Sequence, residues 1–146
     1  MSHLRITKTV FGIFALFNST LLYANDIILV THVDTKIESL TQREVKNLYM
    51  GAALTYEVTP LALSPNNSAR VVFNTKVLGL TESRIQSYWA QMRFTGRKTP
   101  PQTLASEIDI IQKLTSSPNS IGYISADQAL PDNLKVLFST KRKSTR

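Results

Sequence analysis

The stretch "LTQREVKNLYMGAALTYEVTPLALSPNNSAR", Leu40–Arg70, predicts a helix, then a strand, then the start of a second helix. Thr41 and Glu44 have the spacing of a capping box at the start of the first helix. Gly51 directly follows the periodic segment, which is where a glycine ends a helix. Strands that alternate with helices in this way indicate an α/β domain, in which helices cover a sheet.

The same alternation continues on both sides of this stretch. Pro60 lies within the second predicted strand and favours a sheet edge or an irregular start, because proline has no N–H to donate to a ladder. The last predicted helix places Leu104, Ile108, Ile111 and Leu114 on one face. The predicted strands are residues 26–33, 57–64, 120–125 and 133–139. The predicted helices are 39–51, a second one after the turn at 65–68, a third one capped by Thr81, and a fourth one that ends before Ser116.

The first 24 residues have the order of a secretory signal peptide. Arg5 and Lys8 precede an apolar run at 10–17, and Ala24 ends a short polar-to-small segment where cleavage is expected. An uncleaved membrane anchor is the alternative, although a spanning helix needs roughly 20 apolar residues. The sequence therefore predicts a signal peptide over 1–24, a folded secreted domain over 25–140, and a tail over 141–146.

Charge and cysteine content narrow the class of protein. The 146 residues contain no cysteine, which excludes thiol catalysis and cysteine metal sites and favours a bacterial envelope protein over a disulfide-stapled domain. The formal net charge is +7, and loss of Arg5 and Lys8 with the signal peptide leaves +5. Such a domain suits anionic partners. Much of this charge lies in the basic tail, 141–146, which we expect to be disordered.

No motif predicts an enzyme, a metal site or a cofactor. His32 and Asp34 resemble a base with its orienting carboxylate, but no nucleophile has a suitable context. A lone histidine at a strand end is most often structural. No His, Asp and Glu residues have the spacing of metal ligands.

The stretch "YWAQMRFTGRKTPPQ", residues 88–102, combines aromatic and basic residues around a glycine. Thr95, Gly96 and Arg97 are candidate anion-binding residues, because they offer a hydroxyl, an exposed backbone and a guanidinium. The alternative is that Gly96 ends a helix and that Trp89 belongs to the core. The spacing differs from that of a phosphate-binding P-loop.

Three stretches, "LTQREVKNLYMGAALTYEVTPLALSPNNSARVVF", "YWAQMRFTGRKTPP" and "NSIGYIS", together resemble the small periplasmic phosphate-binding-protein-like family. Its members are short relatives of the substrate-binding component of phosphate ABC transporters. The resemblance implies a periplasmic binding protein-like α/β fold, a single small domain with a mixed sheet flanked by helices. It also implies an oxyanion held by helix N-termini, hydroxyls and an arginine.

Carried over residue by residue, the resemblance places Ser64, Ser68 and Arg70 in the family's phosphate loop. The first turn of a helix offers unpaired N–H groups and partial positive charge, which suits an anion. The alternative is that Asn67 or Ser68 only caps the helix while Arg70 is solvated. The loop lacks the Gly-Thr pair expected of such a cradle, and the chain is about as long as one lobe of the full-length relatives plus elements of a second.

The function expected from these observations is recognition of phosphate or another small oxyanion, for delivery to an ABC transporter permease or a membrane sensor. The alternative is an envelope interaction protein that keeps the fold without the ligand. A third possibility is polyanion binding through the basic tail, which fits the charge but not the folded body. We do not expect nucleic acid as a partner.

Overall fold

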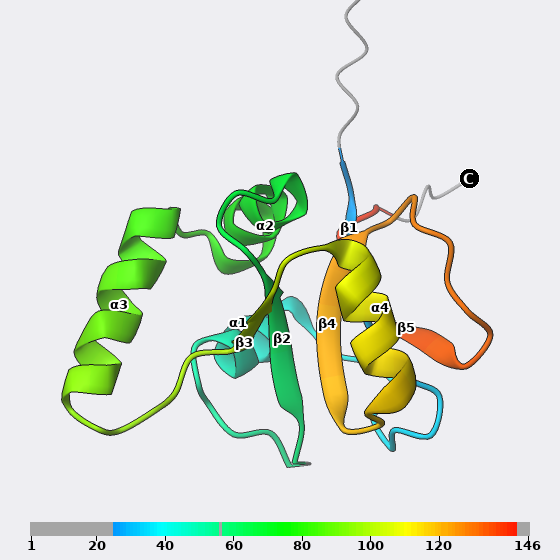
Figure 1. Cartoon of the computed structure of the whole chain (residues 1–146), viewed down its shortest axis with the longest axis horizontal. Helices are drawn as coiled ribbons and strands as arrows, with labels where there is room; N and C mark the ends of the chain where they lie inside the picture. The colour runs from blue at the N-terminus through cyan, green and yellow to red at the C-terminus, as the bar shows by residue number, and fades with distance from the viewer. Residues whose placement is uncertain (1–24, 56, 143–146) are drawn as a thin grey trace, which may run out of the picture.

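The computed structural model describes residues 25–55 and 57–142 of the chain (Figure 1). The predicted signal peptide and the last four residues of the tail lie outside the described residues. Within the described part, no helix has the length and apolar character that crossing a membrane requires.

The described residues form one five-stranded sheet with helices on both faces. A π-helical segment, Asn74–Leu78, directly continues α2. The elements are β1 (Ile27–His32), α1 (Gln42–Tyr49), β2 (Thr59–Leu63), α2 (Ser68–Phe73), α3 (Glu82–Phe94), β3 (Gln102–Leu104), α4 (Glu107–Ser116), β4 (Ser120–Ser125) and β5 (Leu134–Ser139).

The strand order is β3-β2-β4-β1-β5, and the sheet is mixed. β2 runs parallel to both β3 and β4, whereas β1 runs antiparallel to β4 and β5. The parallel strands need helical crossovers, and α2, α3 and α4 supply them. The predicted fold class, α/β with a mixed sheet flanked by helices, is confirmed.

The two faces of the sheet are covered in different ways. Figure 1 shows α4 lying across β4, and Gly122 allows this close approach. A Cβ atom at Gly122 would lie 2.6 Å from Ile110 Cγ2. On the other face an aromatic cluster joins α1, α2 and β4. The ring of Phe73 stacks on that of Tyr123, with 3.8 Å between the ring centroids, and contacts the ring of Tyr49, with 4.8 Å between the centroids.

Helix α3 extends away from the sheet (Figure 1). Ile85 and Trp89 are its buried side chains, as their helical spacing predicts. The hydroxyl of Tyr88 donates a hydrogen bond of 2.7 Å to the Met50 carbonyl, which fastens α3 to the end of α1. The interpretation of Trp89 as a core residue is therefore confirmed.

Both predicted glycine terminators are confirmed. Gly51 has a positive φ of 86°, and the amides of Gly51 and Ala52 donate to the Leu48 and Asn47 carbonyls. Gly96 has a φ of 65° and ends α3 in the same way. The predicted capping box of Thr41 and Glu44 is also present.

Two sequence predictions need correction. Leu104 belongs to the short strand β3, which the prediction missed, and Ile108 is 63% exposed on α4. Leu114 is buried as predicted, and Ile110 is the other buried residue of α4. Pro60 lies near the start of an interior strand, as the second of the two predicted alternatives allowed, and it has no β3 residue beside it because β3 begins only opposite Leu61.

Candidate anion-binding site

The carboxyl ends of β2, β3 and β4 form the edge of the sheet at which α2 and α4 begin. β2 leads through α2 and α3 to β3 on one side, and β3 leads through α4 to β4 on the other side. The strand order therefore reverses between β2 and β4. In open α/β sheets, ligands bind outside the carboxyl ends of the strands at such a switch point.

The loop between β2 and α2 brings two predicted residues to this edge. The Ser64 amide donates to the Leu104 carbonyl, and the Ser64 carbonyl accepts from Asn67 N at 3.0 Å. Asn67 is the N-cap, because its Oδ1 accepts from Ala69 N at 2.9 Å. Ser68 is exposed at the first position of the helix, so its hydroxyl faces solvent rather than the core.

Ser68 lines an open hollow of about 480 Å³ between the starts of α2 and α4. The Glu107 carboxylate closes one side, since it accepts from Ser125 N at 2.6 Å and from Ser125 Oγ at 3.2 Å. The charged side chains that line the hollow are three carboxylates and one ammonium group, and their net negative charge opposes a strongly charged anion. The lining residues are Asn25, Asp26, Ser68, Glu107, Ser125, Ala126, Asp127, Gln128 and Lys141.

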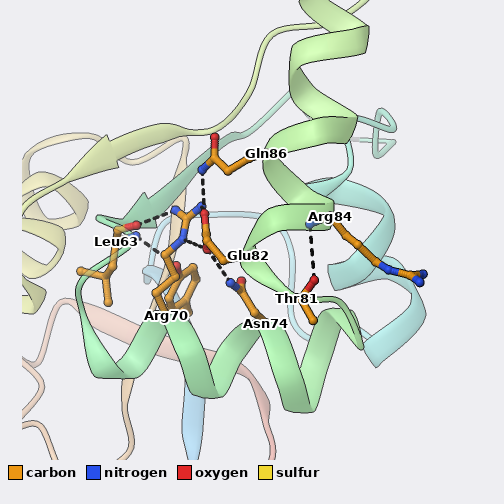
Figure 2. A network of polar contacts seen from close by, with 8 residues as sticks. Leu63, Arg70, Asn74, Thr81, Glu82, Arg84 and Gln86 are labelled. Carbon is orange, nitrogen blue, oxygen red and sulfur yellow. Dashed lines mark hydrogen bonds and ion pairs between the residues drawn. The ribbon is translucent and has the colours of Figure 1, made fainter.

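Arg70 lies beneath this edge and is committed to partners within the chain (Figure 2). Its Nε and Nη2 donate to the two oxygens of Glu82, each at 2.7 Å, and its Nη1 donates to the Leu63 carbonyl at 2.6 Å. Asn74 Nδ2 and Gln86 Nε2 also donate to Glu82. Arg70 is 7% exposed, so the expectation of a solvated arginine is wrong.

The pKa values agree with an internal ion pair. The hydrogen bond from Arg70 is the main cause that lowers the pKa of Glu82 below its usual range. Burial alone would lower the pKa of Arg70, but its bonds to Glu82 raise it, so the guanidinium remains charged. Burial raises the pKa of Tyr123 to about 12, which keeps its hydroxyl neutral.

Side chains complete the backbone hydrogen bonds where β2 and β4 diverge. Leu63 is the last residue of β2, and the β2–β4 register extends only to Leu61. The Leu63 amide donates to the Tyr123 hydroxyl at 3.1 Å, while its carbonyl accepts from Arg70. Arg70 and Tyr123 therefore stabilise the strand end that leads into the candidate loop.

The other predicted site residues, Thr95, Gly96 and Arg97, follow the C-terminal end of α3, whereas Arg70 contacts Glu82 at its start. The Thr95 hydroxyl donates to the Gln91 and Met92 carbonyls, Gly96 ends the helix, and Arg97 is exposed. Figure 1 shows this end of α3 far from the start of α2. The six predicted residues thus fall into two separate groups, and Arg97 does not line the hollow at Ser68.

Sequence reasoning missed the partners of Arg70. Glu82 lies 12 residues away and was not identified. One signal was present, because Arg70 occupies the same helical face as the apolar Phe73 and Val77, where an arginine requires a buried acceptor.

The chemistry of His32 is limited to a local contact. His32 Nδ1 lies 3.3 Å from Asp34 Oδ2, at the end of β1. Over residues 25–55 and 57–142, no three His, Asp or Glu side chains gather where they could hold a metal ion.

Comparisons by sequence found no matching family model and no matching curated protein. Solved structures do match. An ABC-type phosphate transport receptor from Vibrio cholerae has a TM-score of 0.58 and 13% identity, over 78% of this chain and 47% of that one. A putative phosphate ABC transporter substrate-binding protein with bound phosphate, from Clostridium perfringens, has a TM-score of 0.60 and 18% identity, over 78% of this chain and 45% of that one. The chain has a periplasmic-binding-protein fold.

A third match to this binding-protein fold is PstS from Borrelia burgdorferi, with a TM-score of 0.53 and 14% identity over 70% of this chain and 41% of that one. The chain spans less than half the length of each of these structures. The fold that the resemblance implied is therefore confirmed.

Proposed function

We propose that this protein binds phosphate or a similar small oxyanion at the start of α2 and acts outside the cytoplasm in transport or sensing. The observation that carries the proposal is the position of Ser68. It lies at the switch point between β2 and β4, at the first turn of a helix, in the fold that phosphate-transport proteins share.

The anion would contact the exposed Ser68 hydroxyl and the first amide of α2, with Ser64 at the base of the loop. The helix continues through the π-helical segment to Leu78, so its dipole adds partial positive charge at this end. Arg70 supports the loop from below instead of contacting the anion, since Glu82 and Leu63 occupy its donors. Binding is therefore expected to be weak, because a single helix end and two hydroxyls replace a full arginine clamp and because three carboxylates line the same hollow.

The proposed partners are an ABC transporter permease or a membrane sensor that reads the loaded protein. The predicted signal peptide, with cleavage after Ala24, supports export to the periplasm.

Phosphate titration followed by NMR tests the proposal. We expect shifts of the Ser68 and Ala69 amides with phosphate in the millimolar range and their loss in Ser68→Asp, which adds a negative charge at the helix end. Ser83→Asp is the matched control, because Ser83 is exposed in the first turn of α3. Absence of any shift at the start of α2 would refute oxyanion binding there.

A second candidate function is an envelope interaction protein that keeps this fold without a ligand. The observation that favours it is the Arg70–Glu82 pair, because Glu82 already binds the guanidinium that could otherwise bind an anion. Affinity capture from envelope extracts separates the two functions. A stoichiometric partner retained equally by wild type and Ser68→Asp supports the interaction role, whereas a partner lost in Ser68→Asp supports a role for the anion.

A further inference from the structure

The end of α3 carries the most exposed large hydrophobic side chain in the described part of the chain. Phe94 is 94% exposed, more than Ile108 at 63% or Val71 at 57%. We call residues 93–98 the α3 tip. A single exposed apolar side chain is ordinary on a protein surface, so a binding surface here depends on the charges beside Phe94.

The positive charge of the described domain is concentrated on α3 and on the segment that follows it. Residues 82–101 contain Arg84, Arg93, Arg97 and Lys98 against the single acid Glu82, which pairs with Arg70. This segment therefore carries a formal charge of +3, from four cations and one acid. The other described residues carry nine cations and nine acids, which cancel.

The α3 tip has a defined geometry that presents Phe94 outward. Gly96 N donates to the Arg93 carbonyl at 3.0 Å, and Arg97 N donates to the Met92 carbonyl at 3.2 Å, which is a Schellman motif. The aliphatic stem of Lys98 packs at Gly51, where an added Cβ would lie 2.7 Å from Lys98 Cδ. These contacts fix the tip while the ring of Phe94 and the Arg97 side chain remain in solvent.

Figure 1 shows the C-terminal end of α3 at the periphery of the protein, on the left of the view, where the chain turns back toward β3. The Thr95 hydroxyl is used inside the helix, so it does not compete for a ligand. The tip therefore offers one apolar ring and three exposed cations, Arg93, Arg97 and Lys98.

We propose that the α3 tip docks onto an anionic lipid surface, with Phe94 inserted at the headgroup level and the three cations facing lipid phosphates. Aromatic side chains favour this interface, and each Lys or Arg near an anionic membrane adds to the attraction. A fluid membrane accepts one protruding ring without a preformed pocket, whereas a protein partner would have to supply one. One ring and three cations give reversible binding, and this inference is independent of the proposed anion site.

Tryptophan fluorescence on the full chain tests the docking. Phe94→Trp places a reporter at the tip, and Trp89, the one native tryptophan, is 4% exposed and gives a constant background. Vesicles of phosphatidylcholine that contain 30% phosphatidylglycerol by mole fraction should shift the emission of Phe94→Trp to shorter wavelength. Vesicles of pure phosphatidylcholine should not. Val71→Trp, exposed on α2, is the matched control and should not shift, even where residues 1–24 bring the chain to the vesicle.

Charge variants in the Phe94→Trp background test the role of the cations. Removing Arg97 and Lys98 together, as Arg97→Gln with Lys98→Gln, should weaken binding by about fivefold for each charge removed. Arg84→Gln should change it less than about twofold, because Arg84 is ten residues, or about 15 Å of helix, from Phe94 and beyond the screening length of about 8 Å.

Three outcomes would overturn the proposal. These are no shift of Phe94→Trp on anionic vesicles, an equal shift on neutral vesicles, or equal shifts of Phe94→Trp and Val71→Trp. A shift that appears only with an acidic protein from the envelope, and not with vesicles, would assign the tip to a protein partner and reject the membrane. Because Phe94 is almost fully exposed, its substitution should leave the fold intact, which circular dichroism checks.

Discussion

Arg70 and Glu82 form a two-point ion pair, with Nε and Nη2 each 2.7 Å from a carboxylate oxygen, and this pair joins α2 to the first turn of α3. The side chain of Arg70 is 9% exposed and that of Glu82 is 32% exposed. Arg70 is therefore the more buried partner, and its guanidinium needs the negative charge of Glu82 more than the better-solvated Glu82 needs Arg70.

Glu82→Gln should destabilise the protein by about 2 kcal/mol, because it leaves the buried guanidinium without a counter-charge. Urea unfolding followed by circular dichroism measures the change. Arg84→Gln is the control, because Arg84 lies two residues further along α3 and its side chain is exposed. Its free energy of unfolding should remain within about 0.5 kcal/mol of wild type. Equal stabilities of wild type and Glu82→Gln would contradict the structural importance of the pair.

The contribution of Glu82 should disappear in acid. Its pKa is lowered in the folded state, mainly by the hydrogen bond from Arg70, so the folded protein holds the proton less tightly than the unfolded chain. The stabilisation is therefore complete above the unfolded-state pKa of about 4.3 and is lost as the pH falls through the lower folded-state pKa. The difference in unfolding free energy between wild type and Glu82→Gln should shrink from pH 7 to pH 3, and a constant difference would show that charge is not its cause.

Tyr123→Phe should cost about 1–3 kcal/mol, because it leaves the Leu63 amide unpaired in the core at the end of β2. Tyr88→Phe removes a hydroxyl of similar hydrogen-bond length, 2.7 Å to Met50, at a half-buried site that water can reach. It should cost less than about 1 kcal/mol. Thermal unfolding of the two variants gives the comparison, and a larger loss for Tyr88→Phe would be the contrary result.

Gly51→Ala should destabilise the protein more than Gly79→Ala. Both glycines have positive φ, 86° and 65°, so alanine is strained at each by about 1 kcal/mol. At Gly51 the new Cβ would also lie 2.9 Å from Trp89 Cη2, whereas at Gly79 nothing lies within 4 Å. We expect about 2–3 kcal/mol at Gly51 and about 1 kcal/mol at Gly79 by urea unfolding; similar losses would mean that Trp89 moves freely.

Local signals in the sequence predicted most of the helices and strands. The capping box at Thr41, the terminators Gly51 and Gly96, and the buried strand at β4 all depend on neighbouring residues, and all are present. β3 was missed because it has only three residues after two prolines and takes its order from pairing with β2. A strand that depends on a partner elsewhere in the chain leaves little pattern of its own.

The candidate site was less predictable for the same reason. Ser64 and Ser68 could be assigned to the loop, but the state of Arg70 is decided by Glu82, which belongs to a different helix. The separation of Arg97 from that loop depends on the direction in which α3 leaves the sheet, which no local spacing encodes. The sequence therefore identified residue types suited to anions more readily than their arrangement.

Strand β1 lies between β4 and β5, so the first described strand pairs with the last two. Ile27 N and Thr140 Oγ1, which are hydrogen-bonded, are separated by 113 positions along the chain. Such distant pairing raises the contact order and slows folding, since the loop entropy is lost before the contacts form. β1 therefore keeps one of its edges unpaired until β5, the last described strand, is available.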